Sequence, residues 1–444
     1  MGREDNLVTL VRDRLRLHQG TPSRRLAGAL ADLAQTGTIT PGTRLPSERD
    51  LAQAVGVSRG TVAAAFNTLC EEGLCERRHG SGTYVLGTPS FGGLLQAGAV
   101  LADLSTSVVP DPSHLVLPAL DPADLMRAPS GHGYDAMGDP RLRALLQENA
   151  PGAGIGAGEV LITAGAQQGI DLAARVLLRP GDRILVGDPS YGGALSVFRR
   201  AGAHVVALDL TSPEAVTEAI ARHRPAAVYV VSVDNPTGSV PGLQHVAELA
   251  KAADVPVIED RTLAALVYDG TPVPEPLARW HPYGTVTVGS LSKVLWGGLR
   301  VGWLAAPEPM LARLVETKVD ADLATSAVSQ RLAAELLERN PVDPWRAELV
   351  RRRDHFTAAL AARLPEWTWT LPQGGLSIWA RLPGTDTDRF AAVAREHGVA
   401  VAPGSLFSPD GRHRDRLRLS FALRPELLDQ AVTALTQAWT QHRT

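Results

Sequence analysis

The sequence is poor in cysteine and lysine, and it contains no long apolar run. Cys70 and Cys75 are its only cysteines, and no cluster of His or Cys lies beside them. They therefore predict reduced thiols, without a disulfide framework or a metal site. No run of about 18 apolar residues occurs, so no membrane-spanning helix is expected. The opening residues MGREDN lack the pattern of a signal peptide, and a cytoplasmic protein is expected.

The charge balance is also modest. The 444 residues carry a formal net charge of -3. This excludes a generally basic protein that coats nucleic acid, but it leaves room for a local basic patch. The length predicts two or three domains. Neither an internal repeat nor a low-complexity tail is present.

One of the few lysines lies in an unusual sequence context. The sequence has only three lysines against a large excess of arginine, and Lys293 lies in the Gly-rich run TVTVGSLSKVLWGGLRVGW. A lysine amine, unlike a guanidinium, can lose its proton and attack a carbonyl carbon. Together with Ser290, Ser292 and Arg300, this amine suits an aldehyde cofactor that carries a phosphate. A strand-end lysine with capping serines is the competing interpretation of so short a motif.

The first 71 residues carry helical patterns separated by caps and turns. A helix is expected over residues 24–35. Ser47 is expected to cap a second helix that Gly56 ends, and Ser58 is expected to cap a third. The apolar stripe of the third helix consists of Val62, Ala65, Phe66 and Leu69. Two short helices joined by a tight turn predict a helix-turn-helix.

A hairpin follows these helices. Strands are expected at 75–78 and 83–85, joined by Gly80-Ser81-Gly82. Polar residues near the start of the third helix, Arg59 and Thr61, would face base edges in a major groove. The arginines that would meet DNA phosphates are Arg44, Arg49, Arg77 and Arg78. A small helical subdomain with a solvated arginine face is the alternative that this pattern leaves open.

The residues themselves resemble a known DNA-binding family. The segments PGTRLPSERDLA, VSRGTVAAAF, LCEEGL and GSGTYV, within residues 26–85, resemble the winged helix-turn-helix of the GntR superfamily. The resemblance implies a double-stranded DNA operator as partner. Phe66 stands where many relatives have tyrosine. The residues that the GntR resemblance implies at the DNA are Arg49, Ser58, Arg59, Thr61, Gly80 and Gly82, and Arg44 and Ser47 are expected to join them.

Composition divides the remaining chain. Residues 88–130 are rich in Gly, Ser and Pro, and they predict a hinge over 88–103 and an arm over 104–130. We therefore expect a DNA-binding domain over 1–87, a large domain over 131–330 and a small C-terminal domain over 331–444.

The large domain alternates strand-like and helical patterns. This alternation predicts an α/β fold with a doubly wound, mostly parallel sheet, whose ligands bind at the carboxyl ends of the strands. The expected strands are 160–163, 183–186, 204–207, 227–231, 255–258, 285–288 and 301–305. The expected helices are 166–178, 193–201, 213–223 and 244–253.

Functional groups follow four of these strands, and Lys293 follows a fifth. The turn TAGAQQ opens a helix whose backbone N–H groups would hold a phosphate. Tyr191 could stack on a flat ring, although a core tyrosine is the more common interpretation. Asn235 could bond a ring hydroxyl or simply form a turn. Asp260 could pair with a protonated pyridine nitrogen or with a core arginine.

The order of these motifs resembles the fold-type I, class I aminotransferases from about residue 134 to the C-terminus, which implies pyridoxal 5'-phosphate (PLP) as cofactor. Lys293 matches the Schiff-base lysine, Asp260 the partner of the pyridine nitrogen, and Asn235 the residue at the ring hydroxyl. Tyr191 matches the stacked aromatic residue. The residues that match the phosphate cup are Gly165, Ala166, Gln167, Ser290, Ser292 and Arg300.

Three positions need separate comment. Arg418, with Arg416 as its rival, matches the arginine that grips a substrate carboxylate. Tyr134 matches a tyrosine that reaches the site of a neighbouring subunit. Relatives place a tyrosine shortly after the Asp260 position, but this chain has Thr262, which could supply a shorter hydrogen bond. That departure puts efficient transamination in doubt more than cofactor binding.

Together the two parts resemble the MocR family of transcriptional regulators. The resemblance implies a small C-terminal α+β domain, a homodimer arranged head to tail, and control of DNA binding by an amino-compound effector or by PLP itself. A carboxylate-bearing amine is favoured because of Arg418. The alternatives are a working aminotransferase with an attached DNA-binding module and a repressor whose large domain only dimerises.

Overall fold

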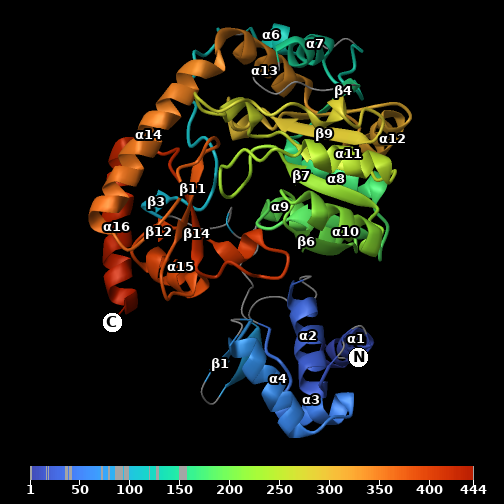
Figure 1. The fold of residues 1–444 in the computed structure, drawn as a ribbon, viewed down its shortest axis with the longest axis vertical. Coiled ribbons are helices and arrows are strands. Elements are labelled where there is room, and N and C mark those ends of the chain that lie inside the picture. The colour runs from blue at the N-terminus through green and yellow to red at the C-terminus, as the bar shows by residue number, and fades with distance from the viewer. Residues whose placement is uncertain are drawn as a thin grey trace. The chain divides into compact units, whose positions relative to one another are not determined.

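The computed structural model describes residues 3–16, 18, 20–35, 39, 43–71, 74–78, 81–85, 94, 100–119, 121–126, 130–149 and 158–443. The chain divides into two compact units, Met1–Ser90 and Phe91–Thr444. Each unit is described separately below (Figure 1).

The N-terminal unit is a helical module with a hairpin. Its helices are α1 (Arg3–Leu15), α2 (Pro22–Gln35), α3 (Glu48–Val55) and α4 (Arg59–Glu71), and its strands are β1 (Cys75–Arg78) and β2 (Gly82–Val85). The strands are antiparallel, with Cys75 opposite Val85. The predicted apolar stripe of α4 is buried in one core with Leu26, Leu30 and Leu51. The winged helix-turn-helix is therefore confirmed, and α1 is an element that the sequence pattern did not predict.

Side-chain caps fix the limits of α3 and α4. The Oγ atom of Ser47 accepts the backbone N–H of Asp50 at 3.2 Å and donates to the Asp50 carboxylate at 2.6 Å. Gly56 ends α3 with a positive φ of 74°, which glycine adopts without strain. The Oγ atom of Ser58 accepts the N–H of Thr61 at 3.0 Å. These caps satisfy N–H groups that a helix leaves without partners.

Both cysteines belong to this unit, and neither forms a disulfide. Burial, together with the neighbouring Cys70, raises the pKa of Cys75 to about 12. Cys75 therefore stays a protonated, unreactive thiol at neutral pH.

The second unit contains a seven-stranded sheet in the order β4-β10-β9-β8-β7-β5-β6. All of its strands are parallel except β10, which runs antiparallel between β4 and β9. The strands are β4 (Glu159–Thr163), β5 (Arg183–Gly187), β6 (His204–Leu208), β7 (Ala227–Val231), β8 (Val257–Asp260), β9 (Thr285–Ser290) and β10 (Gly302–Ala306). All seven predicted strands are present, although β8 starts and ends two residues later than predicted.

Helices cover both faces of this sheet. One face packs on α8 (Ala166–Leu177), α9 (Gly192–Arg200) and α12 (Met310–Asp322). The other face packs on α10 (Pro213–His223) and α11 (Gln244–Ala252). Neighbouring residues of a strand enter different cores: Tyr229 faces α9, whereas Val228 and Val230 face α10 and α11. The predicted doubly wound, mostly parallel fold is confirmed.

A smaller α+β part completes the unit. Its sheet has the order β11-β14-β13, formed by β11 (Ser377–Arg381), β13 (Ala402–Pro403) and β14 (Arg416–Ser420). Strand β12 (Val399–Ala400) pairs in parallel with β3 (Ala102–Asp103), so the end of the expected hinge adds a strand here. The long helices α14 (Val342–Arg363) and α16 (Pro425–Arg443) lie side by side with α15 (Thr387–Glu396) against α16. Trp367, Phe390 and Trp439 meet edge to face between them.

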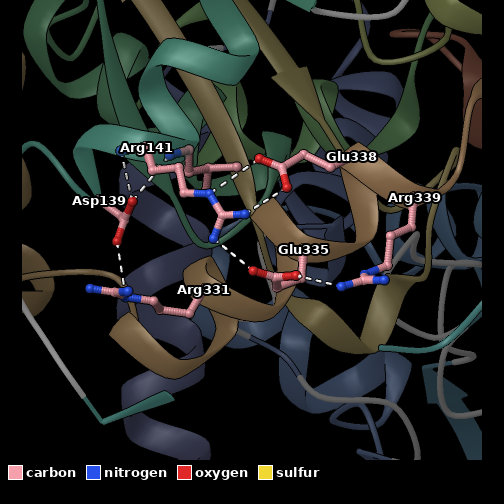
Figure 2. Close-up of polar contacts among 7 residues, drawn as sticks. Asp139, Arg141, Arg331, Glu335, Glu338 and Arg339 are labelled. Atoms are coloured by element: carbon pink, nitrogen blue, oxygen red, sulfur yellow. Dashed lines mark hydrogen bonds and ion pairs between the residues drawn. The ribbon is translucent and has the colours of Figure 1, made fainter. Parts of the chain in front are cut away.

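An ion-pair network joins α7 (Pro140–Asn149) to α13 (Ala327–Arg339) (Figure 2). The Arg141 guanidinium donates to Glu335 at 2.7 Å and to Glu338 at 2.6 Å. Arg331 lies 3.3 Å from the Asp139 carboxylate, which also accepts N–H groups at the start of α7. Hydrogen bonding from Arg141 holds the pKa of Glu335 below its usual range.

The remaining helical segments are short: α6 (Pro122–Leu125), η1 (Ala264–Leu266), η2 (Leu277–Arg279), η3 (Gly297–Leu299) and η4 (Gly404–Phe407). Within the described ranges, no helix is both long and apolar enough to cross a membrane.

A glycine at the centre of the sheet provides a test of its packing. Gly289 on β9 lies opposite Trp303 on β10, and a Cβ atom there would be 2.2 Å from the indole ring. Trp303 is buried and cannot move aside freely. We therefore expect Gly289→Ala to lower the free energy of unfolding by about 1–3 kcal/mol in urea denaturation. Gly297→Ala, where the added Cβ meets open space, is the control; equal stability of the two variants would contradict this packing.

Candidate functional site

The carboxyl ends of parallel strands bring the predicted residues to one edge of the sheet. Gly165 follows β4, Tyr191 follows β5, and Asn235 follows β7; Asp260 ends β8, and Lys293 follows β9. These strands share one direction within the sheet. Their terminal loops therefore open onto a common site.

Lys293 presents its amine to a segment far away in the sequence. Its Nζ atom donates to the carbonyl oxygen of Ser107 at 2.5 Å, and the indole of Trp345 donates to the Lys293 carbonyl at 3.1 Å. Burial, and to a smaller extent the charge of Arg418, lowers the pKa of Lys293 to about 8, although Asp260 opposes this shift. The residue as a whole is only partly buried, so the shift reflects the surroundings of the amine. Such an amine is half neutral near pH 8, so a larger fraction of it is nucleophilic near neutral pH than of an ordinary lysine.

Asp260 is buried at the end of β8, with 4% of its surface exposed. Its Oδ2 atom accepts the hydroxyl of Tyr229 at 2.9 Å, and its Oδ1 atom accepts the N–H of Thr262 at 2.9 Å. Burial raises the pKa of Asp260; donors from Thr262 and Tyr229 and the charge of Lys293 oppose that rise. Among the described residues no arginine binds this carboxylate, so a simple core ion pair does not account for it.

Arg418 on β14 is 2% exposed. Its Nη1 atom donates to the Asn235 side-chain oxygen at 3.0 Å, its Nη2 atom to the Ser105 carbonyl, and its guanidinium lies 4.7 Å from the Phe407 ring centre. Its Nε atom is buried without a hydrogen-bond partner in the described part of the chain. Burial lowers the pKa of Arg418 to about 10, so it stays charged at neutral pH. Arg416 is more exposed and lies near its sequence neighbour Asp415.

The turn between β4 and α8 is arranged to receive an anion. Gly165 adopts a positive φ of 103° and opens α8 without a side-chain cap. The first N–H groups of any helix lack intrahelical partners; here they belong to Ala166 and Gln167. Arg300 donates to the Ala164 carbonyl at 2.6 Å, and a Cβ added to Gly165 would lie 3.2 Å from the Arg300 guanidinium.

Two hydroxyls lie at the same edge. Gly302 on β10 pairs with Thr163 on one side and with Ser290 on the other, which brings the ends of β4 and β9 close together. The Ser290 hydroxyl donates to the Ser292 hydroxyl at 3.0 Å. The predicted phosphate residues are thus gathered around one turn.

The Tyr191 ring lies among the charges of the site. Its hydroxyl donates to Gln167 at 3.0 Å. Burial raises the pKa of Tyr191; the nearby Asp260 raises it further, whereas Arg418 and Arg300 lower it. The hydrogen bond to Gln167 places Tyr191 beside the turn that opens α8.

Contacts with the smaller part of the unit hold the Tyr191 loop. The N–H of Ser190 donates to the Phe407 carbonyl at 2.8 Å, and His413 is 3.0 Å from the Asp188 carboxylate.

A small cleft opens beside Asn235. It is lined by Ser107, Asp234, Asn235, Pro236, Gly238, Leu263, Gly374, Gly375, Leu376 and Ser377.

Two predicted residues differ from the rest. Thr262 lies beside Asp260, and its hydroxyl is buried with no partner of good geometry among the described residues. Tyr134 is 65% exposed, and its ring is tilted against that of His132 at 5.7 Å, so it does not join the site of its own chain. Sequence reasoning missed Tyr229, Phe407 and the carbonyl groups of Ser105 and Ser107. The tyrosine in the otherwise apolar strand AVYVV was the one available signal among them.

In the N-terminal unit, the predicted DNA-contacting residues lie on the surface. Glu48 binds Arg59 at 3.3 Å and Arg77 at 3.2 Å, which links the start of α4 to the first hairpin strand. Exposed residues are Arg44, Ser47, Arg49, Ser58, Arg59, Arg77 and Gly82, and Thr61 is partly exposed. Gly80 and the side chain of Arg78 lie outside the described residues.

Comparison with protein families agrees with both units. Residues 22–85 match the family described as bacterial regulatory proteins, gntR family. Residues 100–435 match aminotransferase class I and II. The chain is therefore an aminotransferase class I and II family member with a GntR-type DNA-binding domain in front. It belongs to the MocR type of transcriptional regulators, which combine these two domains.

Individual relatives show the same organisation. The chain is 30% identical to the uncharacterized HTH-type transcriptional regulator YisV of Bacillus subtilis, over 90% of this chain and 92% of that protein. It is 28% identical to the HTH-type transcriptional regulator TauR of Rhodobacter capsulatus, over 95% and 97%. The structure of LysN, an alpha-aminoadipate aminotransferase from Thermus thermophilus, aligns with a TM-score of 0.68 and 29% identity, over 80% of this chain and 95% of that one.

The lowered pKa of Lys293 predicts a labelling experiment. Because only the neutral amine is nucleophilic, modification of Lys293 by an amine-reactive reagent should rise with pH and reach half its maximum near pH 8. Peptide mass spectrometry after labelling at a series of pH values measures this profile. Lys251, exposed on α11, is the internal reference; an identical profile for both lysines would contradict the prediction.

Proposed function

We propose that the chain is a PLP-binding regulator in which a small amino compound controls the binding of the N-terminal unit to a double-stranded DNA operator. Arg418 carries the proposal. It is a buried guanidinium near Lys293 that has no carboxylate partner among the described residues and keeps one donor free. A buried cation of this kind fits a ligand carboxylate, and the adjacent amine fits an aldehyde cofactor.

The residues present fit PLP. The buried hydroxyl of Thr262 and the turn at Gly165 both offer unused donors. LysN, whose structure was solved in complex with N-(5'-phosphopyridoxyl)-L-leucine, supports the same cofactor. The residues that would hold it are Gly165, Ala166, Gln167, Tyr191, Asn235, Asp260, Thr262, Ser290, Ser292, Lys293 and Arg300.

When bound, PLP supplies an aldehyde that reacts with amines and a ring that withdraws electrons. The protein supplies the conditions for this chemistry. Lys293 offers an amine whose pKa burial lowers, Asp260 offers a carboxylate to a ring nitrogen, and Tyr191 offers a ring face. Arg418 orients an incoming ligand through its carboxylate.

We further propose a homodimer with head-to-tail protomers, in which Tyr134 reaches the neighbouring site. Large apolar side chains are exposed in the segments that surround Tyr134 and Lys293, which supports an interface there. These exposed residues are Val116, Leu117, Met126, Trp296, Leu323 and Val328. Exposed apolar surface of this kind marks association sites.

A working aminotransferase is the second candidate, because Lys293, Asp260, Asn235 and Arg418 lie together. Steady turnover of an amino acid with a 2-oxo acid would support it. Regulator-like relatives over nearly the whole chain favour the sensor.

The sensor predicts a coloured protein. Purified protein with PLP should absorb in the visible range, and the band should shift with one compound from a panel of amino acids. Lys293→Ala should lose both the band and the effector response in a DNA-binding assay, because no other lysine lies in the site. Lys251→Ala is the matched control. A Lys293→Ala protein that keeps the band and the effector response would exclude this switch.

DNA recognition makes a separate prediction. If Arg59 reads a base edge, Arg59→Ala should weaken operator binding by about 1–3 kcal/mol and leave binding to random DNA nearly unchanged. Fluorescence anisotropy with both DNAs measures the difference. Arg222→Ala on α10 is the control arginine. Equal losses on operator and random DNA would make Arg59 a phosphate contact.

A further inference from the structure

Tyr229 carries the only polar side-chain atom of strand β7, whose sequence is AVYVV. The residue is fully buried, and its ring meets Phe198 edge to face at 5.2 Å. Phenylalanine would fill the same apolar space. The hydroxyl therefore needs a reason beyond packing, because a buried hydroxyl costs free energy unless it finds a partner.

Its partner is the carboxylate at the centre of the site. Strands β7 and β8 are parallel neighbours, with Tyr229 opposite Ile258 and Val231 opposite Asp260. Across this pairing the Tyr229 hydroxyl donates to Asp260 Oδ2 at 2.9 Å. The other oxygen of Asp260 accepts the Thr262 N–H. One donor on each oxygen fixes the carboxylate plane and still leaves lone pairs for a third donor, because a carboxylate accepts about four hydrogen bonds.

From this geometry we infer that Tyr229 is a positioning residue that orients Asp260 and keeps it ionised for the ring nitrogen of PLP. The inference rests on the proposed cofactor. Hydrogen bonds to a carboxylate favour its charged form, whereas burial favours the protonated form. Without the tyrosine hydroxyl, burial is less opposed, and a protonated Asp260 cannot serve as the counter-ion of a ring N–H.

If Tyr229 has this role, loss of its hydroxyl should weaken binding only of a ligand that carries the ring nitrogen. A residue that only packs in the core would affect both kinds of ligand equally. The test uses full-length apo-protein titrated with PLP and with 1-deazapyridoxal 5'-phosphate, in which carbon replaces that nitrogen. Quenching of tryptophan fluorescence reports binding. Tyr229→Phe should weaken PLP binding about tenfold, the value of one charged hydrogen bond. Binding of the deaza compound should stay unchanged.

Tyr268→Phe is the matched control. Tyr268 is also buried, but its hydroxyl donates at 2.5 Å to the Gly375 carbonyl and not to Asp260. This variant should treat both ligands alike. In an Asp260→Asn background, Tyr229→Phe should have no further effect on PLP binding, because the two changes act through one contact. Only variants whose circular dichroism spectrum equals that of the wild type, and which are therefore folded, are compared.

The outcomes are separable. If Tyr229→Phe weakens both ligands equally, or neither, Tyr229 is a core residue and the inference is wrong. Should Tyr229→Phe fail to fold, the Asp260→Asn protein decides: an unchanged preference for PLP over the deaza compound overturns the inference. If the wild-type protein takes up neither ligand, the proposed cofactor itself falls.

Discussion

Positive charge collects around Lys293, and one buried carboxylate opposes it. The charges of Arg418 and Arg300 lower the pKa of Lys293, whereas Asp260 is the acidic group that favours the charged lysine. Burying cations is costly unless hydrogen bonds or counter-charges compensate. Here the compensation comes from carbonyl oxygens, those of Ser105 and Ser107, and from the Asn235 amide. The loops of the site are therefore arranged around an excess of positive charge.

The same constraint explains why segments far apart in the sequence meet here. Ser105 and Ser107 lie just after β3, which pairs with β12 in the smaller part of the unit. Asp103 fixes this segment by accepting the N–H and hydroxyl of Ser105 at 2.8 and 2.6 Å. The acceptors that the cations require are thus held by a short parallel strand pair. Loss of that pairing would remove acceptors from both cations at once.

Much of the fold was predictable because buried parallel strands are continuous apolar runs, and their alternation with helical patterns indicates a parallel sheet. Strand β8 was misplaced by two residues for a physical reason. Val255 and Pro256 are apolar, but proline has no N–H for the ladder, whereas the polar Glu259 and Asp260 continue the pairing with β9. Helix α1 was missed because polar and charged residues dominate its sequence.

The position of a site residue was predictable where the residue directly ends or follows a strand, as for Lys293, Asp260 and Asn235. It was not predictable where a residue acts through another. The contact from Tyr229 to Asp260 depends on the register between β7 and β8. The contact between Phe407 and Arg418 depends on how the segment that contains Phe407 packs on the small sheet. Neither leaves a local pattern in the sequence, because each partner lies in a different element.

The carbonyl groups of Ser105 and Ser107 also set a rule for binding. A ligand that takes the place of either carbonyl exchanges one hydrogen bond of Arg418 or Lys293 for another, whereas a ligand that reaches the Nε atom of Arg418 adds a hydrogen bond. A neutral ligand oxygen gains little by such an exchange, whereas a carboxylate gains the difference between a charged and an uncharged acceptor. The segment after β3 therefore competes with a ligand for Arg418 and Lys293, and this competition favours a carboxylate over a neutral ligand oxygen.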